Sequence, residues 1–278
     1  TEGNNNTFVG IGAGAWNTAG NMNVMIGNNA GQNNDIGSDN VFIGKSAGQQ
    51  NDDGSDNVFI GKTSGNKNVG GDWNTFVGSE TGVENTSGFY NTFIGFQAGH
   101  ENTTAGYNTM VGYHAGYFSS TGANQAFLGY KAGYENTGNN NTFIGSEAGY
   151  LSGAGIENVY IGLGAGRECT GSNNVFIGRG AGMSETGNHQ LIIENSVSWN
   201  NDYETLALVY GDFANDWLRV NGNFRVNGTT LQIEQNPGSD ATPAYYAYQG
   251  SGIGSTSKQY AFAINDALWV TQKAWFDN

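Results

Sequence analysis

One pattern of apolar and polar positions recurs along most of the chain. Each copy opens with Asn and then reads Thr or Val, a large apolar residue, an aliphatic residue, Gly, two variable residues, a small residue and Gly. The copies start at Asn6, Asn23, Asn40, Asn57, Asn74, Asn91, Asn108, Gln125, Asn141, Asn158 and Asn174, and a degenerate twelfth copy starts at Gln190. Every step is 16 or 17 residues. This regular spacing predicts a solenoid with one coil per repeat, in which positions are counted from the opening Asn.

The third and fourth positions of the repeat are both apolar. The third-position residues are Phe8, Met25, Phe42, Phe59, Phe76, Phe93, Met110, Phe127, Phe143, Tyr160, Phe176 and Ile192. The fourth-position residues are Val9, Ile26, Ile43, Ile60, Val77, Ile94, Val111, Leu128, Ile144, Ile161, Ile177 and Ile193. Neighbouring residues of a strand point to opposite faces, so one set fills the coil and the other forms a long apolar stripe outside it. Soluble monomers rarely expose such a stripe. The pattern therefore predicts a homo-oligomer, with Phe42, Phe59, Phe76, Phe93, Phe127 and Phe143 in its core or interface.

Glycine and asparagine mark the predicted turns. Glycine holds the fifth and ninth positions from Gly10 and Gly14 to Gly178 and Gly182, and a third series begins with Gly20, Gly37 and Gly54. Asparagine recurs at the first position and again at the twelfth, where the series is Asn17, Asn34, Asn51, Asn68, Asn85, Asn102 and Asn136. Stacked coil on coil, these side chains are expected to form amide ladders. Binding of sugar or ice is the alternative role for the asparagines.

At these motifs the sequence resembles the head of trimeric autotransporter adhesins, the YadA-type parallel β-roll. Asn-Val-Phe-Ile-Gly-Lys-Ser-Ala-Gly at residues 40–48 is similar to that family's Asn-Ser-Val-Ala-Ile-Gly repeat. The resemblance covers residues 1–195 and implies a trimer whose strands pack around a threefold axis. This coil is longer than the family's, and Phe replaces a small residue, so a wider central bundle and another chain number stay open. Similar repeats in phage-type tail fibres leave the parent particle open.

The period ends after Asn195. Residues 196–278 are expected to form a small β-rich connector, and the stretch 217–228 reads as two short strands joined at Asn221-Gly222, a tight-turn pair. The predicted fold is therefore all-β: a parallel β-solenoid (β-roll) of about 12 coils in residues 1–195, followed by the connector. Twelve coils at about 4.8 Å each give a rod of roughly 55 Å. Because the chain begins at Thr1 without Met, we expect it to be a processed or excised piece of a longer protein.

Composition narrows the classes of partner. The formal net charge is −14, from 10 Lys and Arg against 24 Asp and Glu, which argues against nucleic acid and against anionic lipid. No apolar stretch is long enough to insert into a membrane. The lone Cys169 excludes an intrachain disulfide.

Candidate chemistry is sparse, so we expect no enzyme, no cofactor and no metal. His100, His114 and His189 lack metal-ligand spacing, and no catalytic triad or phosphate loop is present. Asp52, Asp53, Asp56 and Asp72 cluster in turn-like sequence, where solvated acids are favoured and calcium binding stays open.

Aromatic residues concentrate at two variable positions of the middle coils. Phe96, Tyr113 and Tyr130 occupy the sixth position, and Tyr117, Tyr134 and Tyr150 the tenth. They should form rows with rings about 5 Å apart, which either bind a cell-surface glycan or protein or stabilise the solenoid. The sequence thus predicts an extracellular adhesin head or shaft, most readily a trimer, with a carbohydrate-binding module of a phage-like tail fibre as the alternative. A polysaccharide-degrading enzyme is disfavoured. The ligand and the chain number stay open.

Overall fold

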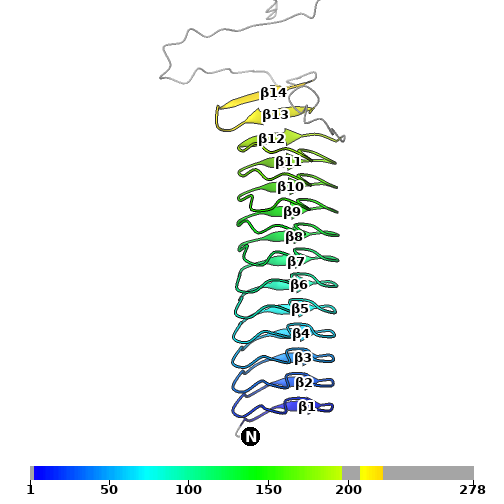
Figure 1. The fold of residues 1–278 in the computed structure, drawn as a ribbon, viewed down its shortest axis with the longest axis vertical. Helices are drawn as coiled ribbons and strands as arrows, with labels where there is room; N and C mark the ends of the chain where they lie inside the picture. Colours follow the sequence, from blue (N-terminus) through cyan, green and yellow to red (C-terminus); the bar gives the residue numbers. More distant parts are fainter. Residues whose placement is uncertain (1–2, 196–206, 222–278) are drawn as a thin grey trace, which may run out of the picture. The chain divides into compact units, whose positions relative to one another are not determined.

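The computed structural model describes residues 3–195 and 207–221, and within them the fold is all-β, a parallel β-solenoid (Figure 1). Twelve short strands lie one above another in chain order. Their bounds are β1 Thr7–Val9, β2 Val24–Ile26, β3 Val41–Ile43, β4 Val58–Ile60, β5 Thr75–Val77, β6 Thr92–Ile94, β7 Thr109–Val111, β8 Ala126–Leu128, β9 Thr142–Ile144, β10 Val159–Ile161, β11 Val175–Ile177 and β12 Gln190–Ile193. The described part contains no helix long and apolar enough to cross a bilayer.

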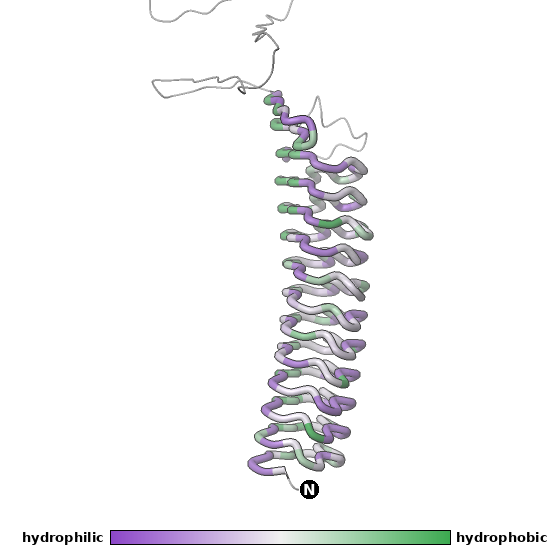
Figure 2. Tube along the Cα trace, turned by 90° about the vertical axis from the view of Figure 1, so that its left-hand side faces the viewer, coloured by the Kyte–Doolittle hydropathy of each residue, from purple (hydrophilic) through white to green (hydrophobic). Residues whose placement is uncertain are grey.

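Each strand pairs in register with the next, so equivalent residues of successive repeats lie side by side. Phe42 pairs with Phe59 across a 17-residue step, and Phe127 pairs with Phe143 across a 16-residue step. The missing residue is therefore absorbed in the turns, and the strand register is kept. Figure 2 shows the same repetition in hydropathy, which recurs at equivalent places from coil to coil. Eleven parallel pairings join β1 to β12 and make about eleven turns.

The third-position side chains fill the inside of the coils. Phe42, Phe59, Phe76, Phe93 and Phe143 are fully buried, and Phe127 is 1% exposed. Successive rings stack face to face with centroids 4.7–5.0 Å apart, as in the pairs 42–59, 59–76, 76–93, 127–143, 143–160 and 160–176. These phenylalanines are therefore core residues of a single chain. Because the rings point into their own coil, the phenylalanines do not form the outward-facing stripe of the strands.

Two asparagine ladders run beside the aromatic stack and confirm the predicted amide stacking. The backbone N–H of Asn57 donates to Oδ1 of Asn40 at 3.0 Å, and that of Asn74 donates to Oδ1 of Asn57 at 2.9 Å. At the twelfth position, Nδ2 of Asn68 donates to Oδ1 of Asn51 at 2.7 Å. Asn57 and Asn68 both donate from Nδ2 to the carbonyl of Gly71. These amides are fully buried, so their hydrogen bonds offset the cost of placing polar groups in the interior.

Cys169 fits this interior because two positions of its coil differ together from those of the other coils. Tyr160 replaces Phe in the ring stack, and its hydroxyl donates to Sγ of Cys169 at 3.0 Å. Cys169 stands at the twelfth position, where most coils have Asn, and its short side chain leaves room for the hydroxyl. Burial raises the pKa of both groups, so the thiol remains protonated at neutral pH. Cys169 is therefore a packing residue.

The twelfth-position amide ladder stops at the coil that contains Ala105, and the next coil has Ser119 in place of Asn. In the first five coils the position equivalent to Ala105 carries Gly, whose carbonyl accepts the twelfth-position amide. Both side-chain polar atoms of Asn102 in the Ala105 coil, and Oδ1 of Asn85 in the preceding coil, are buried without a protein partner among the described residues. This local loss of buried hydrogen bonds coincides with the extra methyl group of Ala105 and with Ser119 in the following coil.

The strand pairing changes from parallel to antiparallel after Ile193. Strand β13, Val209–Asp212, pairs antiparallel with β12, and β14, Trp217–Val220, pairs antiparallel with β13. The run at residues 217–220 is thus a strand, as expected. Its described partner is β13, and the second run of the predicted hairpin lies outside the described residues, as does most of the connector. Strands β13 and β14 belong to the same compact unit as the coils.

The fifth-position glycine is required by both conformation and space. Gly78 has a φ of +142°, and a Cβ placed on it would lie 2.4 Å from the carbonyl oxygen of Gly95 in the next coil. We expect Gly78→Val to destabilise each chain by about 3 kcal/mol, because strain and clash add. Thermal unfolding measures this. Ser79→Val, one residue further on, is the control and should change stability by less than about 0.5 kcal/mol. Equal melting temperatures for the two variants would show that this turn is wrongly placed.

The Ala105 irregularity predicts a stabilising change. Ala105→Gly should let Asn102 bond the turn carbonyl, as its counterparts do, and recover buried hydrogen bonds. We expect a gain of about 1 kcal/mol, reduced somewhat by the extra freedom of Gly in the unfolded chain. The melting temperature should rise by a few degrees. An unchanged or lower value would mean that Asn102 is satisfied in another way.

Candidate functional site

The fourth-position side chains form an apolar row on the outer face of the sheet, termed here the aliphatic row. Its members alternate with the buried rings along each strand, as the pleat requires. Ile43, Ile60 and Ile177 are 36% exposed, and Val9 reaches 55%. Val77, Val111 and Ile193 are partly buried. The row extends over all twelve strands, so one face of the solenoid presents half-covered aliphatic carbon along its length.

The predicted aromatic residues do form two rows. At the sixth position, the Phe96 and Tyr113 rings stack with centroids 5.5 Å apart, and Tyr113 and Tyr130 with centroids 5.4 Å apart. At the tenth position, Tyr117 stacks on Tyr134 at 5.5 Å and Tyr134 on Tyr150 at 5.1 Å. The structure therefore brings together all six residues expected to bind a ligand. Whether they bind one stays a prediction.

Two residues that the sequence pattern did not assign to these rows, His114 and Lys131, connect them. His114 lies 3.9 Å from Tyr113 and 5.1 Å from Tyr117, measured between ring centroids. The ammonium of Lys131 lies 5.3–5.4 Å from the ring centroids of Tyr130, Tyr134 and Tyr150. Both stand at the seventh position, between the sixth and the tenth, and this spacing is the signal that could have identified them. Cation–π attraction to three rings stabilises Lys131 there.

Burial in this cluster favours the neutral forms of its histidine and tyrosines. Desolvation lowers the pKa of His114, and the charge of Lys131 lowers it further. Desolvation likewise raises the pKa of Tyr117 and Tyr134. A histidine with a lowered pKa contributes its full stability above its ordinary pKa and loses it as pH falls below that value. The cluster is therefore built around a neutral imidazole and neutral phenols.

The ring arrangement limits what the rows can bind. Each inner ring turns its face toward its neighbours in the row, so the flat surfaces that would stack on a sugar are largely shared within the chain. Tyr113 and Tyr130 remain 45% and 46% exposed. The rows can thus offer hydrogen-bonding edges to a partner while their faces stabilise the coils.

A third aromatic row was not expected from the sequence. Trp73 stacks on Tyr90 with centroids 4.9 Å apart, Tyr90 stacks on Tyr107 at 5.4 Å, and Phe89 packs edge-on against both tyrosines. Trp73, Tyr90 and Tyr107 have φ values of 54–62°, a left-handed conformation that most other coils assign to Asp or Asn. Bulky residues adopt it at a cost, which the stacking helps to offset. The signal was available: three aromatic residues spaced 17 apart at the last position of the repeat.

The acidic turns do not assemble a metal site. Within residues 3–195 and 207–221, no three His, Cys, Asp or Glu side chains are placed to hold a metal ion. Asp52, Asp53, Asp56 and Asp72 therefore gain no support as calcium ligands from the described geometry.

Comparisons with protein-family models, with curated proteins and with solved structures gave no match.

The aromatic rows predict a measurable effect on stability. Changing Tyr113, Tyr130 and Tyr134 together to Ser removes several ring stacks and two of the rings around Lys131. We expect a loss of about 2–4 kcal/mol, since one stacked pair contributes about 0.5–1.5 kcal/mol beyond its buried area. Thermal unfolding and a surface-attachment assay should be run on the same samples. Unchanged melting combined with lost attachment would instead show that the rings serve a ligand.

Proposed function

We propose that the chain is a non-enzymatic fibrous module that assembles as a homo-oligomer and mediates attachment outside the cell. A trimer is the favoured assembly. The observation that carries the proposal is the aliphatic row, which extends over every strand from β1 to β12. Its natural occupant is a second copy of the chain, because a partner with the same repeat presents the same apolar row with the same spacing.

The energetics of the row favour contact along its whole length. Full burial of a Val or Ile side chain contributes about 1.5–3 kcal/mol, and most side chains of the row are already more than half covered. Each can therefore add roughly 0.5–1 kcal/mol. Association costs about 4–15 kcal/mol in lost freedom of motion, which a few coils cannot offset. Side-by-side packing of most of the twelve strands supplies a comparable sum and also aligns the chains along one axis.

The interior suits a mechanical role. The first-position amide ladder connects every coil to the next beside a continuous stack of third-position side chains, so bending the solenoid would open contacts throughout the stack. A net charge of −14 disfavours nucleic acid and anionic membranes as partners. The partner classes that remain are glycans and proteins on the surfaces of other cells. A carbohydrate-binding module of a phage-like tail fibre is the second candidate, and the exposed tyrosine edges favour it.

The oligomer is tested by the mass of the native particle. Wild-type protein at micromolar concentration should scatter light as a trimer. Ile60→Asp combined with Ile94→Asp places two carboxylates in the aliphatic row and should shift the particle to monomer, because buried unpaired charge is costly.

The matched control is Ile36→Asp combined with Val69→Asp. Both residues are exposed and apolar, and both stand at turn positions where neighbouring coils carry Asp52 and Asp53. This variant should keep the wild-type mass. A well-folded wild-type monomer would contradict the proposal, and so would dissociation of both variants alike.

A further inference from the structure

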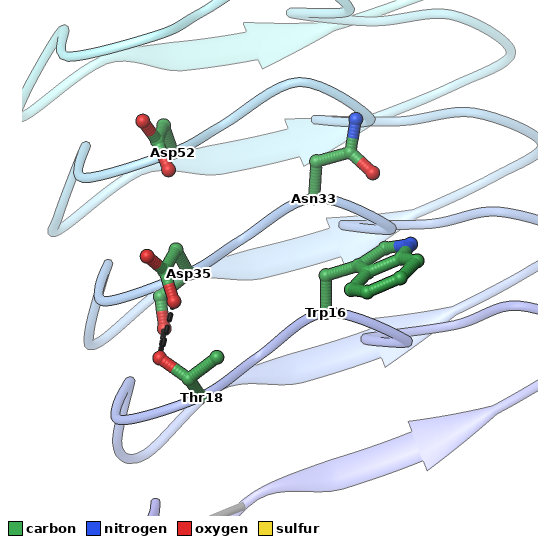
Figure 3. Close-up of a pocket in the computed structure, with 5 residues that line it drawn as sticks. All are labelled: Trp16, Thr18, Asn33, Asp35 and Asp52. Atoms are coloured by element: carbon green, nitrogen blue, oxygen red, sulfur yellow. Dashed lines mark hydrogen bonds between the residues drawn. The ribbon is translucent and has the colours of Figure 1, made fainter.

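A surface hollow of about 350 Å³ lies on the first three coils, away from the aromatic rows. Trp16, Thr18, Asn33, Asp35 and Asp52 line it. Figure 3 shows Trp16 and Asn33 on one side of the hollow and Thr18, Asp35 and Asp52 on the other. The two sides are therefore an aromatic and amide wall facing a hydroxyl and carboxylate wall.

The repeat explains how these residues meet. Trp16 and Asn33 stand at the eleventh position, and Thr18, Asp35 and Asp52 at the thirteenth. The twelfth-position residues between them, Asn17, Asn34 and Asn51, are fully buried. Because that side chain points inward, the two flanking positions form parallel ridges along the solenoid. In the fourth coil the ridge positions change to Lys67 and Val69, so the chemistry of this hollow belongs to the first coils.

Trp16 differs from the aromatic residues of the rows. It is 66% exposed. No stacking or edge contact with another ring is made by its indole within the described part of the chain. A free indole face beside polar groups is a surface on which the C–H face of a pyranose can stack.

The opposite wall offers hydrogen bonds. The Thr18 hydroxyl donates to Oδ1 of Asp35, which fixes the orientation of that carboxylate. The side chains of Asn33 and Asp52 make no hydrogen bond among the described residues, so their amide and carboxylate are free to bind hydroxyl groups. Equivalent wall residues recur once per coil, about 4.8 Å apart, a spacing close to the length of one sugar unit in an extended glycan.

We propose that this hollow binds a short stretch of a neutral saccharide chain, with one pyranose on Trp16 and its hydroxyls donating to Asp52 and Asp35. The two carboxylates, in a chain of net charge −14, exclude uronic acids, sialylated chains and sulfated chains. This site deepens the attachment role proposed above by naming a ligand class. It does not depend on the number of chains, so failure of glycan binding would leave the measured mass of the oligomer unaffected.

The experiment uses the full chain and a panel of immobilised oligosaccharides. The neutral probes are β-1,4-linked hexamers of glucose, mannose, xylose and N-acetylglucosamine, and the anionic probes are hyaluronan and heparin hexasaccharides. Surface plasmon resonance should show retention on at least one neutral probe and none on the anionic ones. Trp16→Ala should weaken that retention by about tenfold or more, and Asp52→Asn should weaken it without any change in melting temperature.

The matched control is Trp73→Asn, which removes an exposed tryptophan of the third aromatic row and introduces a residue suited to its left-handed backbone. It should bind the neutral probe as wild type does. Absence of binding to every neutral probe would overturn the proposal, as would preference for the anionic probes. Equal loss in Trp16→Ala and Trp73→Asn would also overturn it, since binding would then not be local to the hollow.

Discussion

The structure depends on the stacking of like side chains one coil apart. Each coil is too small to bury anything by itself, and its three-residue strand makes few hydrogen bonds. When the next coil lies in register above it, phenyl ring meets phenyl ring at 4.8–5.0 Å and amide meets amide at 2.6–2.8 Å. The gain comes at every interface between coils, so stability accumulates with the number of repeats. A break in the series affects two interfaces at once, as at Asn102, whose side chain pairs with neither Asn85 below nor Ser119 above.

This constraint also shapes the surface. Because each interior side chain must stack on its neighbours, interior positions change little from coil to coil, and most variation lies at positions that point outward. The sixth, seventh, tenth, eleventh, thirteenth and last positions differ between coils, and their side chains nevertheless line up in rows. A substitution at an outward position of a few neighbouring coils therefore creates a surface feature that is confined to those coils. The tyrosine rows, the Trp73 row and the Trp16 hollow are three such features, while the unvarying aliphatic row is the feature that a sister chain can match along its whole length.

Much of the fold followed from the repeat, because period and position are simple physical signals. The 16–17-residue spacing predicted one coil per repeat. The buried Asn ladders followed from the recurrence of Asn at the first and twelfth positions of successive repeats. The pattern could not decide which apolar residue points inward, because Phe59 and Ile60 are both apolar and adjacent. The ring geometry decides it: a phenyl stack fills the coil interior, and the alternate aliphatic row remains outside. Other features depend on side-chain directions in the turns, which the repeat spacing alone does not specify. These features are the stacking of Tyr113 on Tyr130, the contacts of Lys131 with the tyrosine rings, and the hollow at Trp16.

The central claim is that each chain holds its own ring stack and meets its sister chains through the aliphatic row. Electron cryomicroscopy of the native particle tests this most directly, since it shows the chain number and the orientation of the sheet together. The account predicts chains related by a rotation axis along the solenoid, with Ile60, Ile94 and their equivalents facing that axis and Phe59 and Phe93 inside each coil. A map in which the aliphatic row faces solvent, or in which the phenyl rings lie between chains, would contradict it.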